Sequence, residues 1–134
     1  MITIKVPVAW GEQDAFGHLN NAIYFRYFEN VRMHFLEQIG VLRSHREQGI
    51  GVILATTTCQ FERPVHWPQD LTISTWCTHI GTTSFTLAYE IRNEVDEVVA
   101  TGTSVQVSYD YRLGHKVSIL VEQRASMEAL MAPL

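Results

Sequence analysis

Apolar and polar residues alternate at the start of the chain. Apolar side chains occupy every second position at Ile2, Ile4, Val6 and Val8. A period of two is typical of a strand with one buried face, so the pattern predicts a strand over residues 2–9. Pro7 lacks a backbone N–H, which favours an edge position or the end of the strand.

A helical period replaces the alternation between residues 21 and 39. Apolar residues recur three or four positions apart at Tyr24, Phe28, Val31 and Phe35, and a more polar stripe follows Arg26, Asn30, Met33 and Glu37. This pattern predicts a long, deeply buried helix. Gly40 is suited to the left-handed conformation that ends a helix. The polar residues 41–50 predict a turn or a short second helix.

The second half of the chain is rich in β-branched residues. Strands are predicted at residues 52–61, 71–80, 85–92 and 98–109, with a short last strand at 116–120 and helical tendency at 121–131. One long helix followed by consecutive strands indicates an α+β protein, in which the helix packs on one curved antiparallel sheet. The whole chain, 1–134, is expected to form a single domain.

Composition excludes several classes of function. The net charge of −4 and the lack of a basic run argue against a nucleic-acid partner. No segment approaches the about 20 apolar residues of a membrane span. The N-terminus lacks the layout of a signal peptide, so we expect a cytoplasmic protein. Cys59 and Cys77 lie in apolar strand patterns without CxxC spacing and are interpreted as small buried hydrophobic residues. No metal or redox cofactor is expected, because the His and Cys residues lack ligand spacing.

The stretch from Asp14 to Ala22 carries the chemistry that stands out. It reads as a loop with one carboxylate, followed by the N-terminus of the long helix, where Asn20 or Asn21 is a good N-cap. A helix N-terminus presents free N–H groups and partial positive charge. A carboxylate on one side of a carbonyl group and N–H donors on the other suit acyl transfer.

The same stretch resembles a known family. Residues 10–24, with the spacing D-x-x-G-H-x-N-N-x-x-Y and a continuation into Glu29 and Arg32, are similar to the signature of hotdog-fold acyl-CoA thioesterases of the 4-hydroxybenzoyl-CoA thioesterase type. The order of the later elements also fits this family. The resemblance implies the hotdog fold, a long helix wrapped by a curved antiparallel sheet. It also implies hydrolysis of a thioester to a carboxylic acid and free coenzyme A, which enters only as part of the substrate.

The resemblance assigns roles to residues of the motif. Asp14 corresponds to the general base or nucleophile, and the sequence does not separate these roles. Asn21 would supply its backbone N–H to an oxyanion hole. His18 would bind Asp14 or the substrate carbonyl, or support the loop. Glu12 is interpreted as structural or solvated, although a second carboxylate so close to Asp14 could raise a pKa by repulsion.

Substrate-binding residues are expected in two places. Asn20, Tyr24 and Phe28 are candidates near the motif, with core packing as the alternative for Tyr24. An apolar acyl pocket is predicted from Tyr24, Phe28, Phe35, Ile53, Phe61 and Phe85. Thr82, Thr83 and Ser84 align with the loop where relatives place basic residues on the coenzyme A phosphates. This loop has no Lys or Arg, so Lys116 is a further candidate, with Arg112 and His115 nearby.

Two alternatives remain open beside the acyl-CoA thioesterase. The acyl group could be carried by acyl carrier protein, or the domain could bind acyl thioesters without turnover. A hotdog sheet leaves edge strands unpaired, and we therefore expect a homodimer or homotetramer with the active site at the junction between protomers.

Overall fold

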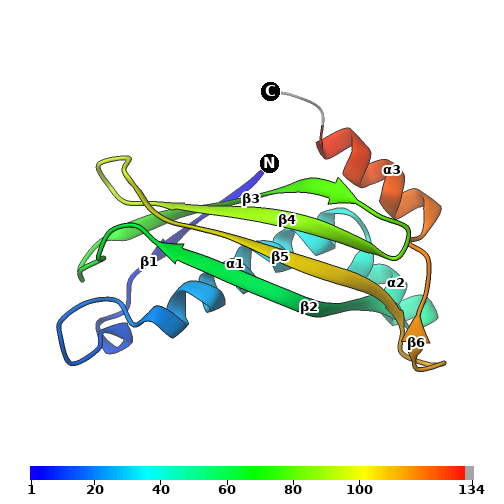
Figure 1. Cartoon of the computed structure of the whole chain (residues 1–134), viewed down its shortest axis with the longest axis horizontal. Helices are drawn as coiled ribbons and strands as arrows, with labels where there is room; N and C mark the ends of the chain where they lie inside the picture. The colour runs from blue at the N-terminus through cyan, green and yellow to red at the C-terminus, as the bar shows by residue number, and fades with distance from the viewer. Residues whose placement is uncertain (132–134) are drawn as a thin grey trace.

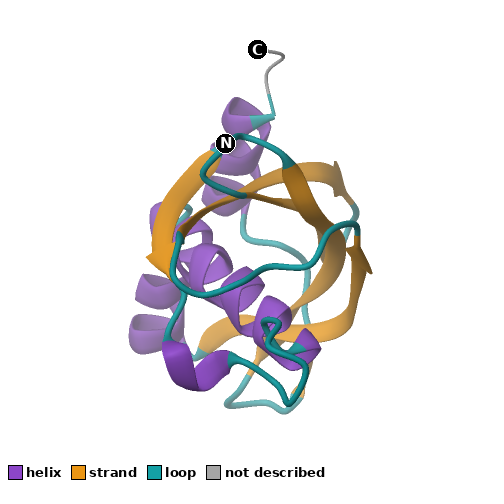
Figure 2. Cartoon of the chain, turned by 90° about the vertical axis from the view of Figure 1, so that its left-hand side faces the viewer, coloured by secondary structure: helices purple, strands orange, loops and turns teal. Residues whose placement is uncertain are grey.

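An antiparallel sheet curls around one long helix in the computed structural model, which describes residues 1–131 (Figures 1 and 2). The elements in chain order are β1 (Ile2–Pro7), the short 3-10 helix η1 (Trp10–Glu12), α1 (Asn21–Gln38), α2 (Val41–Gln48), β2 (Ile50–Phe61), β3 (Asp70–Ile80), β4 (Ser84–Arg92), β5 (Val98–Asp110), β6 (His115–Lys116) and α3 (Val121–Leu130). The strand order is β1-β3-β4-β5-β2, and β6 pairs with β5. The predicted α+β arrangement is confirmed.

The central helix α1 forms as its sequence predicts. Asn20 is the N-cap, because its side-chain oxygen accepts a hydrogen bond from the Ala22 N–H at 2.9 Å. The buried face carries Tyr24, Tyr27, Phe28, Val31, Arg32, Phe35 and Leu36. After the helix, Gly40 has φ +90°, a left-handed conformation that glycine adopts without strain. Residues 41–48 form a second helix, α2, rather than a turn.

The sheet approaches α1 closely enough to require a glycine. A Cβ atom on Gly102 of β5 would lie 2.5 Å from Phe28 Cε2 and 2.5 Å from the Thr58 carbonyl oxygen. Register shifts in the β2–β5, β3–β4 and β4–β5 pairs accompany the curvature. The concave face of the sheet and α1 together enclose the hydrophobic core.

Two predicted strands are shorter in the structure, and the helical tendency at the end of the chain is confirmed. The first strand ends at Pro7 on the edge of the sheet, because the chain turns away into η1. The expected strand at 116–120 shortens to β6, and the Ile119 N–H instead donates to the Thr82 carbonyl oxygen at 3.0 Å. The C-terminal helical tendency becomes α3, which buries Met127 against the core.

Two further expectations concern burial and membrane association. Both cysteines are free, with Cys77 buried and Cys59 half-buried. Within residues 1–131, no helix is both long enough and apolar enough to span a bilayer.

Candidate active site

Main-chain hydrogen bonds fix the loop that precedes α1. The Asp14 N–H donates to the His18 carbonyl oxygen at 2.8 Å, and the Leu19 N–H donates to the Val65 carbonyl oxygen at 2.8 Å. The Asn20 N–H donates to the Glu12 carbonyl oxygen at 2.9 Å, which ties the start of α1 to η1. Leu19 is buried in the core. The loop is therefore anchored on both sides of Asp14.

The side chain of Glu12 helps to hold this loop in place. Its Oε1 accepts hydrogen bonds from the Tyr27 hydroxyl at 2.7 Å and from the Ala9 N–H at 2.8 Å. Burial, and then the bond to this carboxylate, raise the pKa of Tyr27. Tyr27 therefore stays protonated and donates to Glu12. These contacts favour the structural interpretation of Glu12.

Replacing Glu12 should reduce stability. We expect Glu12→Ala to lower the free energy of unfolding by about 1–3 kcal/mol, the cost of leaving the buried Tyr27 hydroxyl unpaired. Urea denaturation measures this change, and Glu37→Ala on the exposed face of α1 serves as the control. Glu12→Gln keeps an acceptor oxygen and should retain activity. Loss of activity at unchanged stability in Glu12→Gln would contradict the structural interpretation.

Asp14 uses one carboxylate oxygen to order the loop. Oδ1 accepts hydrogen bonds from the backbone N–H groups of Phe16 at 2.9 Å and His18 at 3.3 Å. Both contacts end on the same oxygen, which leaves Oδ2 available for a substrate or a water molecule. The loop contacts orient the carboxylate, because two main-chain donors hold Oδ1 in place.

The first turn of α1 leaves one donor next to this carboxylate. The N-cap side chain of Asn20 takes the Ala22 N–H, and the Asn20 carbonyl oxygen accepts from the Ile23 N–H at 2.9 Å. Among the described contacts, the backbone N–H of Asn21 has no acceptor. It lies at the positive end of the helix dipole, which suits a developing oxyanion.

Asp14 and Asn21 line the same open cleft, which has a volume of about 190 Å³. Its lining residues come from the motif, at Asp14, His18, Leu19, Asn21 and Tyr24, and from the end of β2 onward, at Phe61, Glu62, Arg63 and Pro64. Four of the predicted site residues thus come together: Asp14, His18, Asn21 and Tyr24. Asn20 lies beside them as the N-cap.

Tyr24 forms the apolar wall of the cleft. Its ring meets the ring of Phe61 edge to face, with centroids 4.9 Å apart. Burial, with Cys59 as a smaller influence, raises the pKa of Tyr24 to about 12, so its hydroxyl is protonated at neutral pH. Burial likewise raises the pKa of the Cys59 thiol to about 11, which disfavours a reactive thiolate.

His18 supports the loop together with a residue that sequence reasoning missed. The His18 ring lies edge to face against the His66 ring at 5.0 Å, and His66 Nδ1 lies 3.2 Å from the Gly17 carbonyl oxygen. His18 contacts Asp14 through its backbone N–H. Arg63 was missed as well, because its approach to the cleft depends on where β2 ends. It lines the cleft and pairs with Glu97 at 3.3 Å.

The second group of predicted residues lies at the opposite end of the sheet. The loop before α1 begins where Pro7 pairs with Asp70, at the start of β3, whereas Thr82, Thr83 and Ser84 follow the end of β3 (Figure 1). The strand between them has 11 residues, which at about 3.3 Å each separates the two groups by roughly 35 Å along the strand. Lys116 lies with the second group. It pairs with Tyr109 of β5, and the N–H of the adjacent Ser108 donates to the Thr83 carbonyl oxygen at 2.7 Å.

The expected acyl pocket between helix and sheet needs correction. Phe28 is 0% exposed and stacks on Tyr89 with centroids 4.5 Å apart, so it belongs to the core rather than to the cleft wall. Phe35 and Phe85 are buried as well. A helix pressed this closely onto the sheet fills the space between them with its own side chains. Of the six residues expected to form the pocket, Tyr24 and Phe61 line the cleft at Asp14.

Comparisons with known proteins agree with this architecture. The Bacillus subtilis (strain 168) protein YsmA is 30% identical over 123 residues, which cover 92% of this chain and 82% of YsmA. The structure of AQ1494 from Aquifex aeolicus is 26% identical with a TM-score of 0.85, covering 95% of this chain and 99% of that chain. The DHNA-CoA thioesterase from Staphylococcus aureus is 17% identical with a TM-score of 0.87, covering 98% and 91%. At that identity the likeness shows the fold alone.

The family follows from the sequence itself. Residues 8–132 match the model of the Thioesterase-like superfamily, a span that includes the Asp14 loop, α1 and every strand after it. The structural relatives include thioesterases over nearly the full chain. The resemblance seen in the motif is thereby confirmed, and the chain belongs to the Thioesterase-like superfamily with its hotdog fold.

Proposed function

We propose that the protein hydrolyses acyl-CoA thioesters to a carboxylic acid and free coenzyme A. The observation that supports this proposal is the shared cleft of Asp14 and Asn21, which is lined by both a carboxylate residue and the residue with a free helix N–H. A similar fold carries DHNA-CoA thioesterase activity in the Staphylococcus aureus relative. Thioesters suit so sparse a site, because the carbonyl is electrophilic and a thiolate leaves readily.

The proposed reaction has two possible forms. In one, Asp14 removes a proton from a water molecule, whose oxygen attacks the thioester carbonyl carbon. The Asn21 N–H stabilises the oxyanion, which collapses with cleavage of the C–S bond and protonation of the thiolate. In the other, Asp14 itself attacks, and water then hydrolyses the resulting anhydride. Incorporation of ¹⁸O from labelled water into Asp14 during a single turnover distinguishes the two forms.

A thiol-release screen tests the proposed activity. Short, long, branched and aromatic acyl-CoAs are offered in turn, and free thiol is followed with a chromogenic disulfide. Release above the uncatalysed rate for at least one class is expected. Tight binding of an acyl-CoA without thiol release would favour a binding domain instead. Release from acyl carrier protein but from no acyl-CoA would favour the alternative carrier.

A second copy of the chain would reunite the two separated groups of site residues. β2 is an edge strand, and residues 53–58 are exposed along it. A twofold axis that pairs β2 with its own copy makes the two strands antiparallel. The start of the second β2 then lies near the end of the first, beside the Asp14 cleft. Thr82, Thr83, Ser84 and Lys116 occupy that end of the sheet, where they could contact coenzyme A through hydroxyl and N–H groups.

This assembly predicts a homo-oligomer that depends on β2. We expect at least a homodimer in light scattering, and we expect Ile53→Asp to dissociate it, since a carboxylate on an apolar edge disfavours strand pairing. Ile53 is 39% exposed on this edge. Val95→Asp, in the exposed β4–β5 turn, is the control and should leave the mass unchanged. An active wild-type monomer at micromolar concentration would contradict the assembly.

A further inference from the structure

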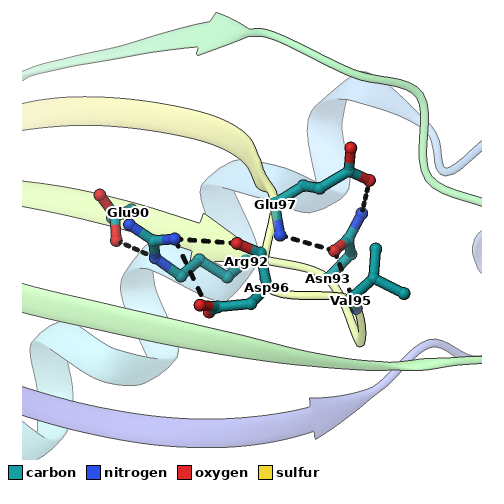
Figure 3. A network of polar contacts seen from close by, with 6 residues as sticks. All are labelled: Glu90, Arg92, Asn93, Val95, Asp96 and Glu97. Carbon is teal, nitrogen blue, oxygen red and sulfur yellow. Dashed lines mark hydrogen bonds and ion pairs between the residues drawn. The ribbon is translucent and has the colours of Figure 1, made fainter.

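Arg32 is a buried cation without a carboxylate partner among the residues that the structure describes. It is 8% exposed, and its Nη1 donates to the Tyr89 hydroxyl at 3.2 Å. Within residues 1–131, no carboxylate oxygen lies within 4.0 Å of its guanidinium. Arg92 shows the usual alternative, because it pairs with Glu90 at 2.6 Å and Asp96 at 3.6 Å near the surface (Figure 3). The other guanidinium nitrogens are not fully buried, since Ser108 Oγ is the one fully buried side-chain N or O atom without a partner among the described residues, and an anion can therefore reach them.

A directed chain of hydrogen bonds holds Arg32 in place. The Tyr89 hydroxyl accepts from Arg32 and lies 2.5 Å from Ser104 Oγ. Ser104 Oγ donates to Gln106 Oε1, and Gln106 Nε2 donates to the Phe85 carbonyl oxygen at 3.2 Å. Because Ser104 uses its proton on Gln106, the Tyr89 proton points to Ser104. The chain therefore takes one guanidinium N–H of five and leaves the others for another acceptor.

Arg32 lines a hollow of about 260 Å³ between α1 and the edge strand β2. The other lining residues are Ala22, Phe25, Arg26, Glu29, Leu54 and Thr57. This hollow neighbours the Asp14 cleft along the same seam, because Asn21 and Tyr24 line the cleft while Ala22 and Phe25 line the hollow. Its walls combine hydrocarbon from Phe25 and Leu54 with the charges of Arg32, Arg26 and Glu29, which leave the lining with a net charge of +1. Such a lining fits a ligand with a hydrocarbon chain that ends in an anionic group.

We propose that Arg32 binds the carboxylate of a small dicarboxylic ligand in this hollow. The planar guanidinium matches a carboxylate with two parallel hydrogen bonds, and the hydrogen-bond chain orients it before the ligand arrives. Resting on the proposed function, the ligand is the acyl group of a thioester whose far end carries the carboxylate. Arg32 is then a specificity-determining residue for substrates that a wholly apolar pocket would not hold.

Binding of the free acid tests the hollow without any thioester chemistry. Hexanedioate is titrated into the wild-type protein, and the Arg32 Nε–Hε resonance is followed by NMR, with hexanoate and hexane-1,6-diol as matched probes. Hexanedioate should shift this resonance most, and Arg32→Met should abolish its binding. An unmoved resonance, or equal binding by Arg32→Met, overturns the proposal. This result stands whether or not the protein hydrolyses any acyl-CoA.

Kinetics test the specificity. The ratio of kcat/KM for hexanedioyl-CoA to that for hexanoyl-CoA should fall about 10- to 100-fold in Arg32→Met, the loss expected for a hydrogen bond to a charged group. Arg32→Lys keeps the charge without the planar fork and should give an intermediate ratio. Arg43→Met, on the exposed face of α2, is the control and should keep the wild-type ratio. An unchanged ratio in both Arg32 variants overturns the proposal.

A carboxylate from a second copy is the competing partner for Arg32, with Glu29 as its source. Sedimentation of Arg32→Met and Glu29→Gln separates the two cases. An assembly that keeps its wild-type mass in both variants supports the small ligand. Dissociation of the assembly by both variants, with an unmoved Arg32 resonance on adding hexanedioate, assigns the carboxylate to the second copy and overturns the proposal.

Discussion

Asp14→Asn should lower kcat for thiol release by about 10²- to 10⁴-fold, the range typical of losing a general base. The amide cannot accept the proton of the attacking water or act as a nucleophile. It does keep an oxygen at the position of Oδ1, which accepts from the N–H groups of Phe16 and His18. The loop should therefore retain its shape, and thermal unfolding should occur near the wild-type temperature.

A matched control for this variant exists in the β4–β5 turn. Asp96 has φ +63°, a conformation that asparagine tolerates well, its side chain is 86% exposed, and it is not among the residues that line the cleft. Asp96→Asn should release thiol at the wild-type rate. If Asp14→Asn kept nearly full activity while folded, Asp14 would lose its assigned role, and the shared cleft would no longer support hydrolysis.

Phe28→Ala should lower the free energy of unfolding by about 3–5 kcal/mol, the cost of removing a large aromatic side chain from a packed core. Phe28 stacks on Tyr89 and fills the space that Gly102 leaves open on β5. Its removal creates a cavity between α1 and the sheet that the rigid strands cannot close. Urea denaturation at 25 °C measures the loss.

Phe16→Ala is the control for this stability measurement. Phe16 is 84% exposed at the tip of the Asp14 loop, so its truncation should change the free energy of unfolding by less than about 0.5 kcal/mol. A small loss in Phe28→Ala, combined with a raised KM, would return Phe28 to the substrate-binding role expected from the sequence.

Local patterns were enough to predict the elements and the position of the Asp14 loop next to the N-terminus of α1. The period of α1, its Asn20 cap and the alternation in β1 are set by neighbouring residues, and the structure confirms each. The Asp14 loop and the helix N-terminus adjoin in sequence. Their meeting in one cleft therefore required no long-range information. The motif also indicated the family, which the comparison confirms.

Only the tertiary structure decided which residues of the helix and the strands contact one another. Phe28 and Tyr24 occupy apolar positions of the same helix. The approach of β5 at Gly102 places Phe28 in the core, whereas the end of β2 leaves Tyr24 at the wall of a cleft. Arg63 joins the site because β2 ends beside α1. In the sequence Arg32 is a polar position of the helix, yet the curled sheet buries its side chain against Tyr89. Periodicity records which face of an element is apolar, whereas the contacts of that face depend on strand order and curvature.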